Sequence, residues 1–367
     1  MGFFGRKRAP SVPHPRKEPR FDGPLTLERL EQIFQDCVDF TKRPVSLGEG
    51  GACTLTLCYL SGMVKMERVS DYVLRPLAQD EALARCGTPR QAMDRMKDGA
   101  LYNLSAEERT RLDAAVFDLV NGCCLLLFPW ESSVLSLNVG TEEKRSISSP
   151  SNETVLKGSR DAFVESLRTN TSIVRRHLKA PELRIREQVV GRQSVTSVDI
   201  LYIEGLTNPH LVEQVAAQLA DIDIDAVLTT GNIEEYIVPA ARTAFPLVQY
   251  TERSDRFCAG LAEGRVGILI DGLPLGYLAP GVLGDFLQAP QDKSESWLLA
   301  SALTLLRYLC MLGTLLLPAL YVAMVTFHQE MIPTRLALSI IAAKQDVPFR
   351  SVFEVIVLLL AFEILQE

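Results

Sequence analysis

The hydrophobic and polar positions in the first third of the chain alternate between helical and strand spacing. Apolar residues recur at helical spacing across Leu25–Phe40, and Ala52–Gly62 follows as a buried strand that ends at a glycine. Met63–Leu77 returns to helical spacing. Two apolar runs, Cys123–Phe128 and Ser133–Val139, flank a short connection as the strands of a hairpin do. These segments predict a unit in which helices pack on a sheet.

A similar order of segments returns about one domain later. Ser197–Leu206 has the composition of a strand. Asn208 is placed to cap the next helix, and Pro209 suits its first position. Arg265–Ile270 and Leu273–Ala279 then flank an Asp-Gly turn as two strands. The fold class predicted for this polar region is therefore α/β, with two similar subdomains of mixed sheets and flanking helices.

Two pentapeptides suggest that the second subdomain repeats the first. Cys58–Gly62 matches Leu201–Gly205 in its pattern of apolar, polar and glycine positions. An internal duplication would explain this match. Two unrelated strand–helix units that share a common pattern would explain it as well, so the sequence leaves both interpretations open.

The end of the chain carries a long apolar run. Tyr308–Phe327 contains 20 residues without a charge, which as a helix cover about 30 Å, the hydrocarbon thickness of a bilayer. The apolar run begins earlier, at Leu298, but includes Arg307. A span that begins at Tyr308 keeps this charge at the interface and leaves Trp297–Leu306 along the surface. We therefore expect the span at 308–327.

Interruptions of this apolar region mark the candidate membrane residues. Pro318 cannot donate a backbone hydrogen bond, so the span is expected to bend there, which favours packing against neighbours within the bilayer, with a simple kinked span as the alternative. Val355–Phe362 is short for a second span, and the glutamates on either side of it fall on opposite helix faces. The candidates for pore lining, gating or anchoring are Arg307, Pro318, His328, Glu330, Glu354 and Glu363.

Charge and cysteine spacing exclude several classes of protein. The net charge of −7 argues against a chain that binds nucleic acid. The eight cysteines show no Cys-x-x-Cys spacing and fall mostly in apolar patches, as small core residues do in a reducing compartment. The chain also lacks the phosphate-loop, nucleophile-elbow and zinc-protease motifs. We therefore expect no enzyme, no metal site and no cofactor.

Basic residues gather at two places. The first 22 residues are basic and contain several prolines, which predicts a disordered tail, with attraction to anionic lipids as the alternative. Ser159–Lys179 is predicted to be an amphipathic helix with a basic side, which is either solvated or docks on a neighbouring subunit. The candidate subunit-interface residues are Arg168, Arg175, Arg176, Glu252 and Arg253.

Several long motifs resemble the A-subunit family of GerA-type spore germination receptors. The resemblance covers residues 153–365 and is specific, because the motifs occur in the family's order. The motifs are GSRDAFVESLRTNTSIVRRHLKAPELRI, YIEGLTNPHLVEQV, VQYTERSDR, EGRVGILIDG and the region from Leu305 to Phe349 followed by FEILQE. Leu247 and Ser254 differ from the glutamine and proline common in the family.

The resemblance implies a nutrient-sensing germination receptor subunit in the inner membrane of a spore. Its α/β region would be cytoplasmic, and its partners would be an integral-membrane B subunit, a lipoprotein C subunit, further copies of the chain and membrane lipids, but no nucleic acid. Such a subunit would contribute to ion release when a germinant binds. A stage V-type paralogue that amplifies ion release, a membrane-anchored scaffold and, least favoured, a soluble α/β enzyme are the alternatives.

These patterns together divide the chain into four regions. Residues 1–22 form the tail, 23–150 the N-terminal α/β subdomain and 151–296 the second α/β subdomain. Residues 297–367 form the membrane region, with one full span and interfacial or partial helices. Members of the resembled family continue into further membrane helices, so we expect the membrane region to be truncated at Glu367.

Overall fold

The computed structural model describes residues 21–47, 54–84, 86, 88–101, 106–129, 131–140, 161–226, 247–288, 292, 296–344 and 349–366. The predicted basic tail, residues 1–22, lies outside this part of the chain except for its last two residues. The chain divides into two compact units, Met1–Val282 and Leu283–Glu367. Within the first unit we call residues 21–140 the first subdomain and residues 161–282 the second subdomain.

The first subdomain is built on an antiparallel sheet. Its described strands lie in the spatial order β1-β2-β4-β5-β3, and every neighbouring pair is antiparallel. The strands are β1 (Phe40–Ser46), β2 (Thr54–Leu60), β3 (Ala106–Arg109), β4 (Cys123–Leu127) and β5 (Val134–Asn138). The helices are α1 (Leu27–Ile33), α2 (Met66–Val69), α3 (Arg75–Gln79), α4 (Glu81–Ala84), α5 (Pro89–Arg95) and α6 (Leu112–Val120), with π-helical turns at Ser70–Leu74 and Met96–Ala100.

The second subdomain repeats this arrangement. Its described strands lie in the order β6-β7-β9-β10-β8, again with antiparallel neighbours. The strands are β6 (Leu183–Val190), β7 (Thr196–Ile203), β8 (Gln249–Thr251), β9 (Val266–Ile270) and β10 (Gly276–Ala279). The helices are α7 (Leu167–His177), α8 (Pro209–Ala220) and α10 (Ser254–Ala262). The predicted α/β class with two subdomains is confirmed, but the described ladders are antiparallel rather than mixed.

The identical strand order supports the internal duplication suggested by the two pentapeptides. β2 and β7 end in corresponding turns, in which Gly62 and Gly205 adopt φ angles of +82° and +80°. The backbone bonds at these turns also correspond: Ser61 N donates to Asp39 O at 2.7 Å, and Glu204 N donates to Glu182 O at 2.9 Å. Two sheets with one topology and one turn geometry favour duplication over a chance similarity of pattern.

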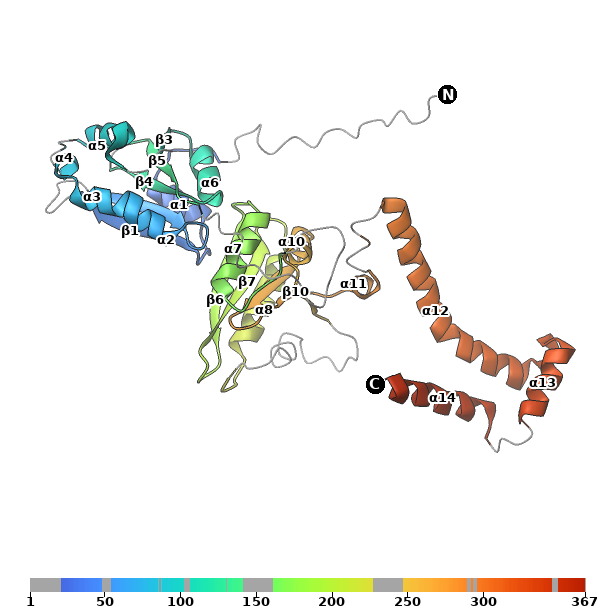
Figure 1. Ribbon diagram of the computed structural model, residues 1–367. Coiled ribbons are helices and arrows are strands. Elements are labelled where there is room, and N and C mark those ends of the chain that lie inside the picture. The colour runs from blue at the N-terminus through green and yellow to red at the C-terminus, as the bar shows by residue number, and fades with distance from the viewer. Residues whose placement is uncertain are drawn as a thin grey trace, which may run out of the picture. The chain divides into compact units, whose positions relative to one another are not determined.

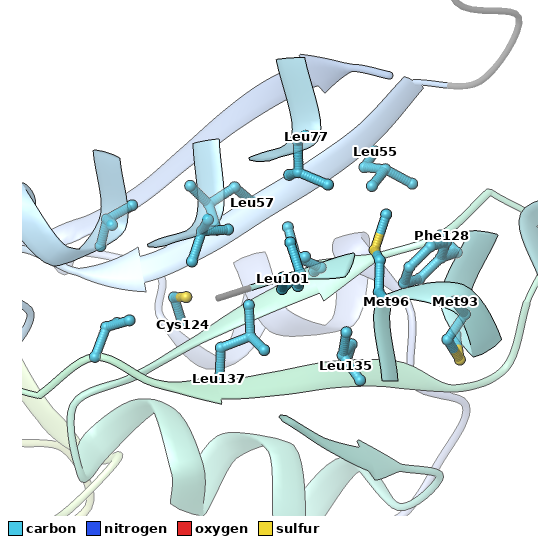
Figure 2. Close-up of a cluster of buried hydrophobic side chains, with 14 of the residues drawn as sticks. Leu55, Leu57, Leu77, Met93, Met96, Leu101, Cys124, Phe128, Leu135 and Leu137 are labelled. Carbon is cyan, nitrogen blue, oxygen red and sulfur yellow. The ribbon is translucent and has the colours of Figure 1, made fainter. Parts of the chain in front are cut away.

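Helices cover both faces of each sheet because the strands are apolar on both sides. In β2, Leu55 and Leu57 join one buried cluster with Leu77 of α3, whereas Cys58 and Leu60 join a second cluster with α1 and α6. Figure 2 shows the first cluster, in which side chains of β2, β4 and β5 meet those of the helices. The second subdomain has the same two clusters, one under α8 and one under α7 and α10. Each subdomain therefore has three layers.

Two predicted helices are shorter than their apolar patterns. The helix predicted for Leu25–Phe40 ends at Ile33, because Asp36 adopts a φ of 57° and Val38 N donates to Ile185 O in β6 at 3.0 Å. The helix predicted for Ser159–Lys179 begins only at Leu167. In both cases hydrogen bonds to distant residues hold the backbone outside the helix; before α7, Phe163 N donates to Glu252 O at 2.8 Å.

The second unit consists of helices. They are α11 (Leu283–Leu287), α12 (Trp297–Phe327), a 3₁₀ turn (Gln329–Met331), α13 (Thr334–Lys344) and α14 (Ser351–Gln366). The side chains of α12 are not buried, and this 31-residue helix, which includes Arg307, is long enough and apolar enough in composition to cross a membrane. Trp297–Leu306, predicted to lie along the surface, instead continues directly into the predicted span as one helix. Figure 1 shows that this helix bends, in agreement with Pro318 inside it.

Candidate functional site

The two subdomains meet where the loop between α1 and β1 reaches the edge of the second sheet. Cys37 forms a parallel bridge with Ile185 of β6. Val38 N donates to Ile185 O at 3.0 Å, and Ile185 N donates to Asp36 O at 3.1 Å. The first subdomain thus adds an isolated bridge to the edge strand β6 and pairs backbone groups there that would otherwise stay open. We call this contact and the side chains around it the junction.

A buried ion pair lies at the centre of the junction. Arg175 of α7 donates from Nε to Asp39 Oδ2 at 2.8 Å and from Nη2 to Asp39 Oδ1 at 2.9 Å. Both side chains are only 1% exposed. Burial alone lowers the pKa of Arg175, but the Asp39 carboxylate outweighs this effect and raises it overall. Arg175 therefore keeps its charge, and its bidentate contact with Asp39 ties α7 to the first subdomain.

Two arginines of β6 extend the junction on the same side. Arg184 donates from Nη1 to the backbone oxygen of Ile33 and pairs with Glu204 in its own subdomain. Arg186 donates from Nη2 to Asp36 Oδ2 at 2.9 Å. Arginine suits these contacts because its planar fork binds two partners at once. The strand β6 thus contributes backbone and side-chain bonds to the same short loop.

The junction also contains a buried thiol. Cys37 Sγ donates to Leu183 O at 3.4 Å. Elsewhere in the unit, burial raises the pKa of Cys58, Cys124 and Cys258 to about 12. These thiols remain protonated at neutral pH and serve as small core groups, which is the role predicted for the cysteines.

A cavity of about 560 Å³ opens beside the junction, between α6 and the end of α7. A cavity of this volume at a subdomain boundary has the size of a small-molecule site. Its walls are mostly apolar, and a carboxylate, an ammonium and an imidazole lie among them. The lining residues are Phe21, Asp113, Ala114, Val116, Phe117, Val120, His177, Leu178, Lys179, Ala180 and Pro181.

A second buried carboxyl, Asp199 of β7, lies under α7. The hydroxyl of Thr171 has one proton but two acceptors at 2.9 Å, Leu167 O and Asp199 Oδ2. Asp199 Oδ1 has no hydrogen-bond partner among the described residues. Burial raises the pKa of Asp199 to about 6, although Thr171 and Arg168 act in the opposite direction.

Ser254, His177 and Asp161 lie close together without forming a catalytic relay. Ser254 Oγ lies 3.1 Å from His177 Nε2, and Asp161 Oδ2 lies 3.6 Å from the same nitrogen. In a relay the carboxylate orients the opposite ring nitrogen. Ser254 Oγ also donates its proton to Asp161 O at 3.0 Å. This arrangement holds the loop before α7 against α10 and does not activate the serine.

Two of the predicted subunit-interface residues are buried: Arg175 of α7 and Arg253 at the start of α10. Arg175 was expected on an outer face but is buried at the junction, because Asp39 of the first subdomain neutralises it. Arg253 is also buried and pairs with Asp255. Neither guanidinium is available to a neighbouring subunit in this structure.

The other interface candidates lie nearer the surface. Arg168 is exposed and donates to Glu187 at 2.8 Å. Arg176 is half-buried and makes no ion pair with the described residues. Glu252 accepts a backbone bond from Phe163 N at 2.8 Å. Their role in subunit contacts remains a prediction.

Arg307, a candidate on α12, has a partner that the sequence did not indicate. Its Nη1 donates to Asp292 and to Leu287 O, the latter at 3.1 Å, and its Nη2 donates to Asp292 Oδ1 at 3.1 Å. The Asp292 carboxylate is buried by this contact. Both charges of the pair belong to the second unit.

The remaining membrane candidates are spread along the second unit. Pro318 lies inside α12, His328 ends that helix and Glu330 lies in the 3₁₀ turn after it. Glu354 and Glu363 are both in α14. No ion pair joins these five among the residues that the structure describes, so their predicted pore or gating role remains a prediction.

Sequence reasoning missed the acidic partners of the arginines. Asp39 is separated from Arg175 by 136 residues, and Asp292 lies outside any apolar or charged pattern. One available signal was the alternation of Arg184 and Arg186 in a strand that is otherwise apolar at its start. Two arginines on one strand face predict acidic or carbonyl partners nearby.

Comparisons with known proteins agree with this architecture. The chain matches the family described as Bacillus/Clostridium GerA spore germination protein over residues 28–367. It is similar to the uncharacterized membrane protein YfkQ of Bacillus subtilis (strain 168), with 33% identity over 341 residues, 93% of this chain and 65% of the relative. It is also similar to spore germination protein KA of the same organism, with 34% identity over 329 residues, 90% of this chain and 60% of the relative.

A solved structure has the same fold. It is the crystal structure of the N-terminal domain of the A subunit of the Bacillus megaterium spore germinant receptor GerK3, with a TM-score of 0.57 and 26% identity. The match covers 72% of this chain and 99% of that domain. The chain spans 65% and 60% of the lengths of YfkQ and protein KA. The family match, the related sequences and the shared fold establish that this chain belongs to the GerA spore germination protein family.

Proposed function

We propose that this chain is the A-type subunit of a nutrient-sensing germination receptor in the inner membrane of a spore. One observation carries the proposal: a single chain joins an α/β unit like the GerK3 A-subunit domain to an exposed apolar helix of membrane length. In this role the α/β unit lies in the cytoplasm, and the second unit belongs to the membrane region.

The receptor role requires partners and an output. The chain assembles with an integral-membrane B subunit and a lipoprotein C subunit, forms homo-oligomers, and contributes to ion release when a germinant binds. The bidentate Arg175–Asp39 pair holds the two subdomains in one orientation, so that they act as a single body on these partners. The proposal assigns no catalytic step to the chain.

A membrane-anchored protein without a transport role is the second candidate. This candidate is supported by the similarity to YfkQ, which is named only as a membrane protein. The chain is nearly as similar to YfkQ, at 33% identity, as to the spore germination protein KA, at 34%. A stage V-type paralogue that amplifies ion release belongs to the same group of alternatives. A soluble α/β enzyme is least favoured, because α12 exposes many large apolar side chains.

Spores that lack the gene distinguish these functions. The receptor role predicts that spores without the natural gene fail to release potassium in response to at least one nutrient, and that a plasmid copy restores the response. A matched copy with Arg192→Met, a change in an exposed ion pair, restores it equally. A normal response of the deletion strain to every nutrient, together with recovery of the protein of wild-type spores in the soluble fraction, contradicts the proposal.

A further inference from the structure

The helix α12 is longer than the hydrocarbon core of a bilayer, so its start relative to the membrane has to be decided from its contacts. Its 31 residues rise about 46 Å, which exceeds the hydrocarbon core of about 30 Å but matches the bilayer including its headgroup regions, about 40–45 Å. Arg307 lies ten residues after Trp297, or about 15 Å along the helix. If α12 spans the whole bilayer from Trp297, Arg307 lies inside the edge of the hydrocarbon.

The contacts of Arg307 reduce the cost of placing its charge in the membrane, which is the main argument against a span that begins at Trp297. An isolated guanidinium in hydrocarbon is costly, and on sequence grounds this cost favours a span that begins after Arg307. In the structure, however, Asp292 neutralises Arg307 through a bidentate contact, and Leu287 O accepts a further bond. A hydrogen-bonded pair with no net charge enters a low-dielectric region far more readily than an isolated ion.

The segment that supplies Asp292 is itself suited to a membrane interface. Leu283 and Phe286 of α11 are exposed, and so are Trp297 and Leu298 at the start of α12. Tryptophan and other large apolar side chains prefer the boundary between headgroups and acyl chains. α11 also lies close to α12, since a Cβ on Gly284 would meet Tyr308 Oη at 3.4 Å. These apolar groups are therefore continuous with the predicted span.

We infer that Asp292 is the counter-ion that lets α12 enter a phospholipid bilayer from Trp297 onward, with α11 lying beside it at the boundary between headgroups and acyl chains. The span thus begins about ten residues earlier than its uncharged stretch indicates. Asp292 acts as a positioning residue, since it sets the depth of α12 through Arg307. The inference rests on the membrane attachment in the proposed function.

The depth of Trp297 in vesicles tests this inference. The full chain with Trp130→Phe, which leaves Trp297 as the one tryptophan of the sequence, is reconstituted in phosphatidylcholine vesicles that contain lipids brominated near the headgroup. We expect strong quenching by these lipids and little quenching by iodide in water. Asp292→Asn leaves Arg307 unpaired and pulls it to the interface, so bromolipid quenching falls and iodide quenching rises, each by at least about twofold.

Two further variants separate a counter-ion from a merely structural role. The double variant Asp292→Asn with Arg307→Gln removes both charges and is expected to restore the original depth. Asp285→Asn, which removes a carboxylate of α11 outside this pair, leaves the depth unchanged. An inserted protein whose Trp297 is open to iodide from the start, or does not respond to Asp292→Asn, overturns the inference alone. A protein that never inserts contradicts the proposed function as well.

Discussion

Removing the charge of Arg175 tests whether the junction holds the two subdomains together. Arg175→Met keeps much of the apolar stem but leaves the Asp39 carboxylate buried without its partner. Breaking a buried pair in this way costs about 3–5 kcal/mol. The exposed pair Arg192–Asp223 provides the matched control, because its side chains are 69% and 68% exposed. Arg192→Met is expected to cost less than about 1 kcal/mol.

The two effects are measured by urea unfolding of residues 1–282, the compact unit whose counterpart in GerK3 was solved as a separate domain. A double variant, Arg175→Met with Asp39→Leu, replaces the pair by apolar groups. It is expected to recover most of the lost stability, so the double-mutant cycle gives a coupling energy of about 3 kcal/mol. A cost for Arg175→Met equal to that of the Arg192 control would refute the claim that the junction depends on this pair.

Three further predictions concern the second subdomain. The raised pKa of Asp199, about 6 against 3.8, means that this carboxyl favours folding below pH 4 and loses its contribution as the pH rises through about 6. This effect lowers the free energy of unfolding by about 3 kcal/mol between pH 4 and pH 8, as measured by urea unfolding. Asp199→Asn is expected to remove this pH dependence, and an unchanged pH profile in the variant would contradict the prediction. Gly276→Ala places a Cβ 2.6 Å from the ring of Phe257 and 2.7 Å from that of Phe163, so calorimetry should show a loss of stability of about 1–3 kcal/mol. An unchanged stability would mean that the two rings move aside without cost. Asn208→Ala removes the cap bond to His210 N and should cost about 1 kcal/mol, whereas Asn208→Asp should cost little.

Much of the fold follows from local patterns in the sequence. The strands β4 and β5 and the strands β9 and β10 were predicted as hairpins, because apolar runs flank short turns there. The cap at Asn208 and the first helical position at Pro209 were predicted from residue type alone and are present in the structure. These features depend on interactions within a few residues, which a sequence pattern records.

Features that depend on distant contacts were not predictable. The end of α1 is set by Ile185, about 150 residues away, which binds the backbone of the loop after the helix. The same separation concealed the burial of Arg175, since an arginine on a helix that is basic on one side normally faces solvent. Asp292 was missed because its partner Arg307 was interpreted as an isolated interfacial charge. In each case the decisive group has no local signature.

The most direct test of the receptor role is purification of the natural protein from spore inner membranes through an affinity tag. The receptor role predicts that detergent-solubilised protein brings down an integral-membrane B-type subunit and a lipoprotein C-type subunit in comparable amounts, and that the chain resists carbonate extraction. Recovery of the chain in the soluble fraction, or from membranes without either partner, would contradict its role as a receptor subunit.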